Sequence, residues 1–136
     1  ISGFPLKAYQ ELNAFKLFML DVGLLAALAD LSIQTVLQGN ALFEEFKGAL
    51  TEQYVAQELC LLEGANASYW SSDTSRAEVD FLIQGQDSIY PLEVKATENL
   101  QAKSLKVYNE KFSPPRCLRI SLSPYREERW LTNIPL

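Results

Sequence analysis

Two neighbouring segments of alternating polar and apolar residues constrain the fold of this chain more than any other feature. The alternation runs over residues 77–84 and again over residues 88–96, and Gly85, Gln86 and Asp87 separate the two segments. A period of two is typical of β-strands with one buried face. A connection of about three residues that contains glycine joins antiparallel neighbours. We therefore expect a β-hairpin here.

The register of this hairpin decides which side chains meet across it. If Gln84 faces Ile89 across the turn, Asp80 lies opposite Glu93; a slip of one residue would break this arrangement, and the sequence leaves both registers open. Alternation then puts these two carboxylates on one face together with Lys95, and it puts Val79 and Phe81 on the other face. Directly opposed carboxylates repel and weaken strand pairing, so we expect a divalent cation to compensate. Hard oxygen ligands suit Mg²⁺, with Mn²⁺ as the alternative.

Helices and strands alternate along the rest of the chain. Outside the hairpin we expect helices over 22–31, 42–63 and 101–112, strands over 67–71 and 116–122, and a short strand or tail over 129–134. From residue 42 onward this order is αβββαβ. A strand–helix–strand crossover implies a parallel strand pair and helices on both sheet faces. The sequence therefore predicts an α/β fold with a central mixed β-sheet of four or five strands flanked by helices.

The first 40 residues precede this core and are expected to extend it. Phe15 to Leu20 could form a short strand or the start of a helix, and Asp21 is well placed to cap the helix that follows. The chain begins at Ile1 and contains no phosphate-binding GxxxxGK[ST] loop. We expect residues 1–136 to be one domain taken from a longer protein.

Composition excludes several kinds of site. The 136 residues contain no histidine, which rules out Ser-His-Asp and Cys-His catalysis and histidine-ligated zinc. Cys60 and Cys117 are too few for a disulfide framework or a four-thiolate metal site. We expect both to be reduced thiols in the core.

No segment predicts a membrane or export signal. The apolar stretch from Leu17 to Leu28 is interrupted by Asp21 and is shorter than the roughly 20 residues that a bilayer requires. Ile1 to Leu6 lacks the basic region and cleavage site of a signal peptide. We therefore expect a cytoplasmic protein.

Charge is unevenly distributed. The net charge is −5, which argues against a stand-alone domain that binds DNA without sequence preference. Residues 1–93 hold 4 basic and 13 acidic side chains, whereas residues 94–136 hold 8 basic and 4 acidic ones. The basic part is either a solvated face or a source of phosphate contacts for a site whose acidic groups lie upstream.

Glu52 lies in the middle of the predicted long helix, on a surface that otherwise favours packing. Its neighbours three and four residues away are Gly48, Ala49, Val55 and Ala56. A carboxylate in such surroundings needs a partner, a metal or a raised pKa. If this helix packs on the face that carries the two strand carboxylates, Glu52 becomes the third member of the cluster.

Lys95 follows Glu93 by two residues, and two roles are open for it. Its ammonium could stabilise negative charge that develops at a phosphate beside a metal ion. Its other role is a cross-strand salt bridge with Glu78. The Glu-x-Lys pattern alone favours the salt bridge. Its combination with a helical glutamate and a strand aspartate is more specific.

This combination resembles the PD-(D/E)XK nuclease superfamily, which has the restriction-endonuclease-like fold. A closer similarity is to an uncharacterised prokaryotic family in which an AAA-type ATPase domain precedes a C-terminal domain of unknown function with this nuclease-like fold. The similar stretches are FKLFMLDVGLL (15–25), KGALTEQYVAQEL (47–59), AEVDFLI (77–83), LEVKA (92–96) and KSL (103–105). The resemblance implies an N-terminal ATPase domain as a partner in the full-length protein, with DNA as a further partner.

The resemblance also implies roles for individual residues. Asp80 and Glu93 correspond to the two metal-ligating acids of the superfamily, and Glu52 corresponds to the helical acid that supports the metal. Lys95 corresponds to the lysine of the motif. The basic residues expected near the phosphate on the following helix are Lys103 and Lys106. Val79 stands where the name-giving motif has proline, a departure that many members share.

Two functions follow from this resemblance. The first is Mg²⁺-dependent hydrolysis of phosphodiester bonds in DNA by a Glu/Asp/Glu-x-Lys site. The second is a catalytically silent module that binds nucleic acid or protein and is attached to an AAA-type ATPase, because the fold also occurs in members that do not cut.

Overall fold

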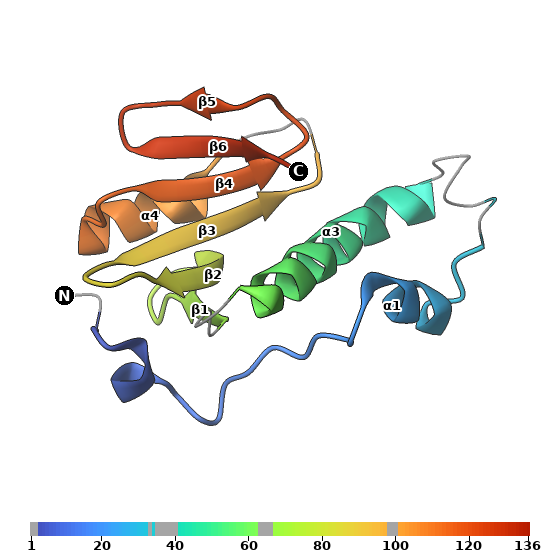
Figure 1. Ribbon diagram of the computed structural model, residues 1–136, viewed down its shortest axis with the longest axis horizontal. Helices are drawn as coiled ribbons and strands as arrows, with labels where there is room; N and C mark the ends of the chain where they lie inside the picture. Colours follow the sequence, from blue (N-terminus) through green and yellow to red (C-terminus); the bar gives the residue numbers. More distant parts are fainter. Residues whose placement is uncertain (1–2, 33, 35–40, 63–66, 98–100) are drawn as a thin grey trace.

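The computed structural model describes residues 3–32, 34, 41–62, 67–97 and 101–136, and places them around one six-stranded sheet (Figure 1). Its strands are β1 (Ser68–Ser71), β2 (Glu78–Gln84), β3 (Ile89–Lys95), β4 (Cys117–Ser121), β5 (Arg126–Glu127) and β6 (Leu131–Pro135). The helical elements within the described residues are the 3₁₀ turn η1 (Leu6–Tyr9) and the helices α1 (Val22–Leu28), α3 (Ala41–Leu61) and α4 (Lys103–Phe112).

The sheet is mixed, as the sequence predicts. The strand order is β1-β2-β3-β4-β6-β5, in which β3–β4 and β4–β6 are parallel and the other neighbours are antiparallel. The crossover between β3 and β4 contains α4, which explains why that pair is parallel. The α/β class and the flanking helices are confirmed. The sheet has six strands rather than four or five because residues 126–127, for which no strand is predicted, pair with β6.

The predicted register of the hairpin is confirmed. Gln84 pairs with Ile89, and Phe81 pairs with Leu92, in one unbroken antiparallel ladder. The short connection after Gln84 thus aligns the two strands as their alternation requires.

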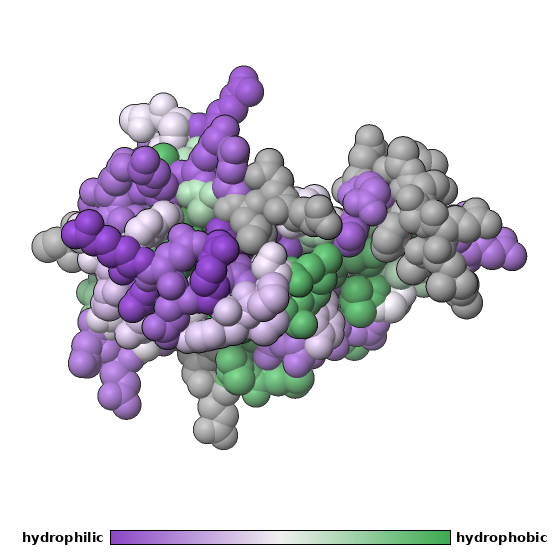
Figure 2. Space-filling view, turned by 90° about the horizontal axis from the view of Figure 1, so that it is seen from above, coloured by the Kyte–Doolittle hydropathy of each residue, from purple (hydrophilic) through white to green (hydrophobic). Residues whose placement is uncertain are grey.

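Two hydrophobic cores lie on the two faces of the sheet. The α4-side core contains buried residues of β2, β3, β4, β6 and α4: Val79, Leu82, Ile89, Leu105, Tyr108, Cys117 and Leu131. The α3-side core contains buried residues of α3, β2 and β3: Val55, Ala56, Leu59, Phe81 and Leu92. Seen from above, hydrophilic residues cover most of the sheet end of the molecule, and hydrophobic ones gather between it and the helical end (Figure 2).

One residue of β2 interrupts the alternation that the sequence predicts. On β1, Ser68 pairs with Leu82 and Trp70 pairs with Val79, so two residues of β1 match three of β2. This irregularity is a β-bulge at Asp80 and Phe81. The prediction that Val79 and Phe81 share a face is therefore wrong: Val79 lies in the α4-side core and Phe81 in the α3-side core.

Residues 10–20, called here the N-terminal segment, run along α3 without forming a helix or a strand. The predicted strand or helix at Phe15 to Leu20 is wrong. Side chains of α3 take over the role of a pairing partner. The amide of the buried Gln53 accepts a hydrogen bond from the Met19 N–H (2.8 Å) and donates one to the Met19 carbonyl (2.9 Å). The ring of Phe18 stacks on Phe81 with centroids 5.8 Å apart.

The structure confirms the predicted helix cap and one of the two predicted buried cysteines. Asp21 does cap α1, because its Oδ1 accepts a hydrogen bond from the Leu24 N–H at 2.8 Å. The helix ends at Leu28 rather than 31 because the chain turns at Asp30, whose φ is 52°. Cys117 is buried as expected, but Cys60 is exposed. Within the described residues, no helix is long and apolar enough to cross a membrane.

Packing of α4 on the sheet is a main source of stability, and a pair of substitutions on this helix tests it. Leu105→Ala removes a fully buried side chain of the α4-side core and is expected to lower the free energy of unfolding by about 2–5 kcal/mol. Val107→Ala on the same helix removes a side chain that is 37% exposed and should change stability by less than about 1 kcal/mol. Urea denaturation of both variants measures the difference. Equal losses would contradict this core assignment.

Candidate metal-binding and catalytic site

Three carboxylates from α3 and β2 converge on one ammonium group. Lys16 Nζ, from the N-terminal segment, lies 2.9 Å from Glu52 Oε1 and 2.5 Å from Glu78 Oε1. It lies 3.8 Å from Asp80 Oδ1. Glu52 therefore lies near Asp80, as expected, but Glu93 is not among the partners of Lys16, so the expected grouping of all three acids is met only in part. Lys16, Glu52, Glu78 and Asp80 are together called the carboxylate–lysine cluster.

The bulge in β2 explains how Asp80 joins this cluster. Its carboxylate also reaches the next strand, where Oδ2 accepts a hydrogen bond from the Val94 N–H at 2.8 Å. Burial raises the pKa of Asp80 to about 6, and the negative charge of Glu52 adds to the rise, while the Val94 hydrogen bond and Lys16 oppose it. Lys16 and the Val94 hydrogen bond therefore compensate the negative charge of ionised Asp80 only in part.

Glu93 lies beside this cluster with a different set of partners. Its side chain is only 6% exposed, and Lys95 Nζ lies 3.1 Å from its Oε1. The second oxygen, Oε2, is buried and has no hydrogen-bond partner within the described part of the chain. Burial raises the pKa of Glu93, while Lys95 and Arg119 oppose the rise. An unsatisfied carboxylate oxygen in a buried site is costly unless something binds it.

Asp80 and Glu93 do not share one sheet face as alternation alone predicts. Leu92 and Val94, on either side of Glu93, pack in the α3-side core. Glu93 therefore belongs to the α4 side of β3. Asp80 approaches it from the bulge, at the edge of the β2–β3 ladder. The two remain close enough that the charge of Glu93 contributes to the raised pKa of Asp80.

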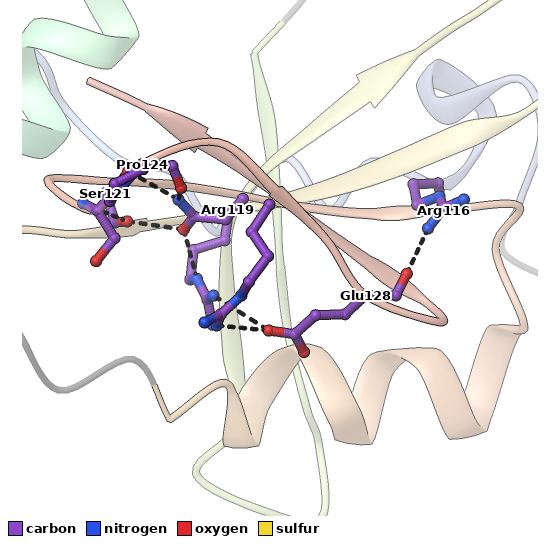
Figure 3. A network of polar contacts seen from close by, with 8 residues as sticks. Arg116, Arg119, Ser121, Pro124 and Glu128 are labelled. Carbon is purple, nitrogen blue, oxygen red and sulfur yellow. Dashed lines mark hydrogen bonds and ion pairs between the residues drawn. The ribbon is translucent and has the colours of Figure 1, made fainter.

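A buried arginine stands next to Glu93 on the neighbouring strand. Arg119, which is 2% exposed, is the register partner of Glu93. Its Nε donates a hydrogen bond to Asn133 Oδ1 (2.9 Å), and its guanidinium lies 3.9 Å from Glu128 Oε1. Figure 3 shows this network, in which Arg116 also donates a hydrogen bond to the main-chain carbonyl of Glu128 at 2.8 Å. The network fixes the Arg119 charge beside the site.

The other lysines are placed differently from the alternatives considered above. Lys95 pairs with Glu93, and Glu78 pairs with Lys16, so the possible Lys95–Glu78 salt bridge is not formed. Lys103 and Lys106 are exposed on α4. The first turn of this helix lies beside the start of β2, because Ser104 Oγ accepts a hydrogen bond from the Glu78 N–H at 3.3 Å.

Lys16, Gln53 and Arg119 are residues of the site that the sequence pattern does not predict. Lys16 lies in a segment whose structure is not periodic, and its partners are 36 and more residues away. The exposure of this segment does alternate along the chain. Lys16 and Phe18 point inward, whereas Phe15 and Leu17 are 70% and 83% exposed.

The donor set can be tested against a divalent cation. Asp80 and Glu93 supply hard oxygen ligands, which Mg²⁺ and Mn²⁺ prefer. Glu93 Oε2 has no hydrogen-bond partner in the described part of the chain, so it suits the role of such a ligand. Within the ranges described, however, no three acidic or cysteine side chains are already arranged to hold a metal ion. Lys16 stands among the carboxylates instead.

A mixed α/β domain with a paired carboxylate site on its second and third strands is thus the class that fold and site define. The chain belongs to the family described as Domain of unknown function (DUF4143), whose model matches residues 47–136. The match includes Glu52, Asp80, Glu93 and Lys95 but not Lys16. No curated protein matches the sequence.

The raised pKa of Asp80 predicts how stability depends on pH. Folding raises this pKa from 3.8 to about 6, so the ionised form destabilises the folded state fully above pH 6 and not at all below 3.8. Asp80→Asn should therefore stabilise the metal-free protein by about 1–2 kcal/mol at pH 7.5. Chemical denaturation in the presence of a chelator measures this gain.

The matched control is Asp87→Asn, at an exposed position in the turn before β3. This variant should change the free energy of unfolding by less than about 0.5 kcal/mol at pH 7.5 and at pH 3.5. The gain from Asp80→Asn should vanish at pH 3.5. A gain that persists unchanged at pH 3.5 would contradict the assignment to ionisation of Asp80.

Proposed function

We propose that this chain is a PD-(D/E)XK nuclease-like domain that hydrolyses phosphodiester bonds in DNA with Mg²⁺ or Mn²⁺ as cofactor. One observation carries the proposal. Two carboxylates from adjacent strands are undercompensated: Asp80, whose side chain is 22% exposed, has a raised pKa, and the buried Glu93 keeps one oxygen without a hydrogen-bond partner in the described part of the chain. Undercompensated acids in one site are typical of places where a cation binds.

Each candidate site residue has its own role in the proposed hydrolysis. Asp80 and Glu93 would bind the cation directly, and Glu52 would support it from α3. A divalent cation held there supplies positive charge that stabilises negative charge on a phosphate. Lys95 holds an ammonium 3.1 Å from Glu93, from which it can donate hydrogen bonds to a phosphate oxygen. Lys103 and Lys106, exposed on α4, would contact the backbone of the nucleic acid further from the reacting group.

The wider setting of this proposal follows the resemblance described above. We place the domain at the C-terminal end of a cytoplasmic protein whose preceding domain is an AAA-type ATPase. The net charge of −5 opposes tight binding of DNA by this domain alone. A nuclease of this charge needs its attached partner to hold the substrate.

A second function, that of a catalytically silent binding module, is favoured by a different observation. Lys16 and Lys95 already neutralise the acidic groups of the site at 2.5–3.1 Å. A cluster compensated in this way can be purely structural. This alternative predicts neither metal binding nor cleavage, so a metal titration separates the two functions.

The direct test is calorimetric titration of the chain with Mn²⁺ at pH 7.5. The nuclease proposal predicts binding in the millimolar range or tighter. It also predicts that Asp80→Asn and Glu93→Gln each weaken binding by at least about tenfold. At a concentration of 100 times the dissociation constant, Mn²⁺ should raise the free energy of unfolding by about 2.7 kcal/mol. Glu110→Gln, at an exposed position on α4, should bind Mn²⁺ like the unchanged chain.

Cleavage is then assayed on single- and double-stranded DNA with the same variants. Metal-dependent cutting that both Asp80→Asn and Glu93→Gln abolish would support the nuclease. Metal binding without cutting would leave the metal site standing and contradict hydrolysis of DNA by this chain on its own. If Mn²⁺ does not bind at 10 mM, a concentration about tenfold above the expected range, the proposed metal site is wrong.

A further inference from the structure

Lys16 stands where it interferes with a cation. Its Nζ lies 2.9 Å from Glu52, 2.5 Å from Glu78 and 3.8 Å from Asp80. Mg²⁺ binds oxygen at about 2.0–2.1 Å. Carboxylates that are spaced around the larger ammonium group of Lys16 are therefore too far apart to bind one Mg²⁺ ion together. This spacing accounts for the absence of a ready-made three-ligand group among the described residues.

The segment that carries Lys16 is held mainly by side chains. Within the described ranges, no backbone–backbone hydrogen bond joins residues 10–20 to the sheet or to α3. Its attachments are the Gln53 amide on Met19, the stacking of Phe18 on Phe81, and Lys16 itself. A segment without ladder hydrogen bonds can leave at a small cost in free energy.

The packing beneath this segment is also incomplete. A cavity of about 570 Å³ lies between the N-terminal segment and β1, and both Lys16 and Asp80 line it. Aromatic residues line it as well, among them Tyr9, Tyr69 and Trp70. Because the segment spans a cavity, its departure breaks fewer close contacts than it would over a filled core, and it increases the exposure of Asp80, whose side chain is now 22% exposed.

We propose that Lys16 is an internal competitor of the divalent cation, so that the N-terminal segment blocks the metal site until it is displaced. This inference rests on the proposed metal site and adds a regulatory contact to it. The competition is electrostatic, because the Lys16 ammonium and a divalent cation would both be attracted to the carboxylate of Asp80 and its neighbours. The carboxylate spacing that suits the ammonium does not suit the cation, so the two cannot bind there together. Glu52 and Glu78 stay paired with Lys16 when no metal is present.

The experiment compares Mn²⁺ affinity in three variants of the chain. Lys16→Met keeps an unbranched side chain but removes the charge, and it should bind Mn²⁺ about tenfold more tightly than the unchanged protein. Lys16→Arg retains a cation and should bind Mn²⁺ no more tightly than the unchanged protein. Lys47→Met removes a lysine of α3 that lies 3.9 Å from Glu44, and it should have no effect.

Limited trypsin digestion of the unchanged protein provides a second readout that needs no variant. Displacement of the segment exposes the bond after Lys16, so Mn²⁺ should accelerate cleavage there severalfold. Cleavage after Lys47 should not change.

The outcomes separate this inference from the proposed function. Equal Mn²⁺ affinities in the unchanged protein and Lys16→Met would overturn the competition and leave the metal site standing. Slower cleavage after Lys16 in Mn²⁺ would overturn it as well. Failure of Mn²⁺ to bind any variant would overturn the metal site and the competition together.

Discussion

The carboxylates of Asp80 and Glu93 lose most of their contact with water where β2 and β3 run side by side, and their charged neighbours compensate for that loss. Lys16, Lys95 and Arg119 reach the pair from three separate parts of the chain. The compensation is incomplete, because burial still raises the pKa of both acids. A site of this kind gains free energy from any further cation.

The β-bulge connects this electrostatic site to the architecture of the sheet. It turns Asp80 toward α3 and Lys16 while the rest of β2 keeps its register with β3. Without the bulge, strict alternation would place Asp80 on the side of β2 opposite Phe81, which is the side of the α4 core. Bulges are common beside functional sites, because they redirect one side chain without breaking the sheet.

Much of the architecture could be predicted from periodicity, whereas the site could be predicted only in part. The hairpin, α3, α4 and β4 follow from residues whose partners are close in sequence or repeat with a clear period. The bulge at Asp80 could not be predicted, because it depends on how β1 pairs with β2. The role of Lys16 could not be predicted either, since Glu52 and Glu78 are distant in sequence and only the fold brings them to it.

The same distinction explains why Glu52 was found and Arg119 was not. A lone carboxylate among Gly48, Ala49, Val55 and Ala56 stands out on a helix. Arg119 lies in an alternating strand, where a polar residue normally faces solvent, and its burial depends on Asn133 and Glu128 from the following strand and loop. Long-range polar networks leave little trace in local patterns.

A crystal structure of this domain soaked in Mn²⁺ tests the central claim most directly. The account predicts an anomalous difference peak between the carboxylates of Asp80 and Glu93, with Lys16 withdrawn from Glu52. A crystal in saturating Mn²⁺ without such a peak, in which Lys16 still lies between Glu52 and Glu78, would contradict it.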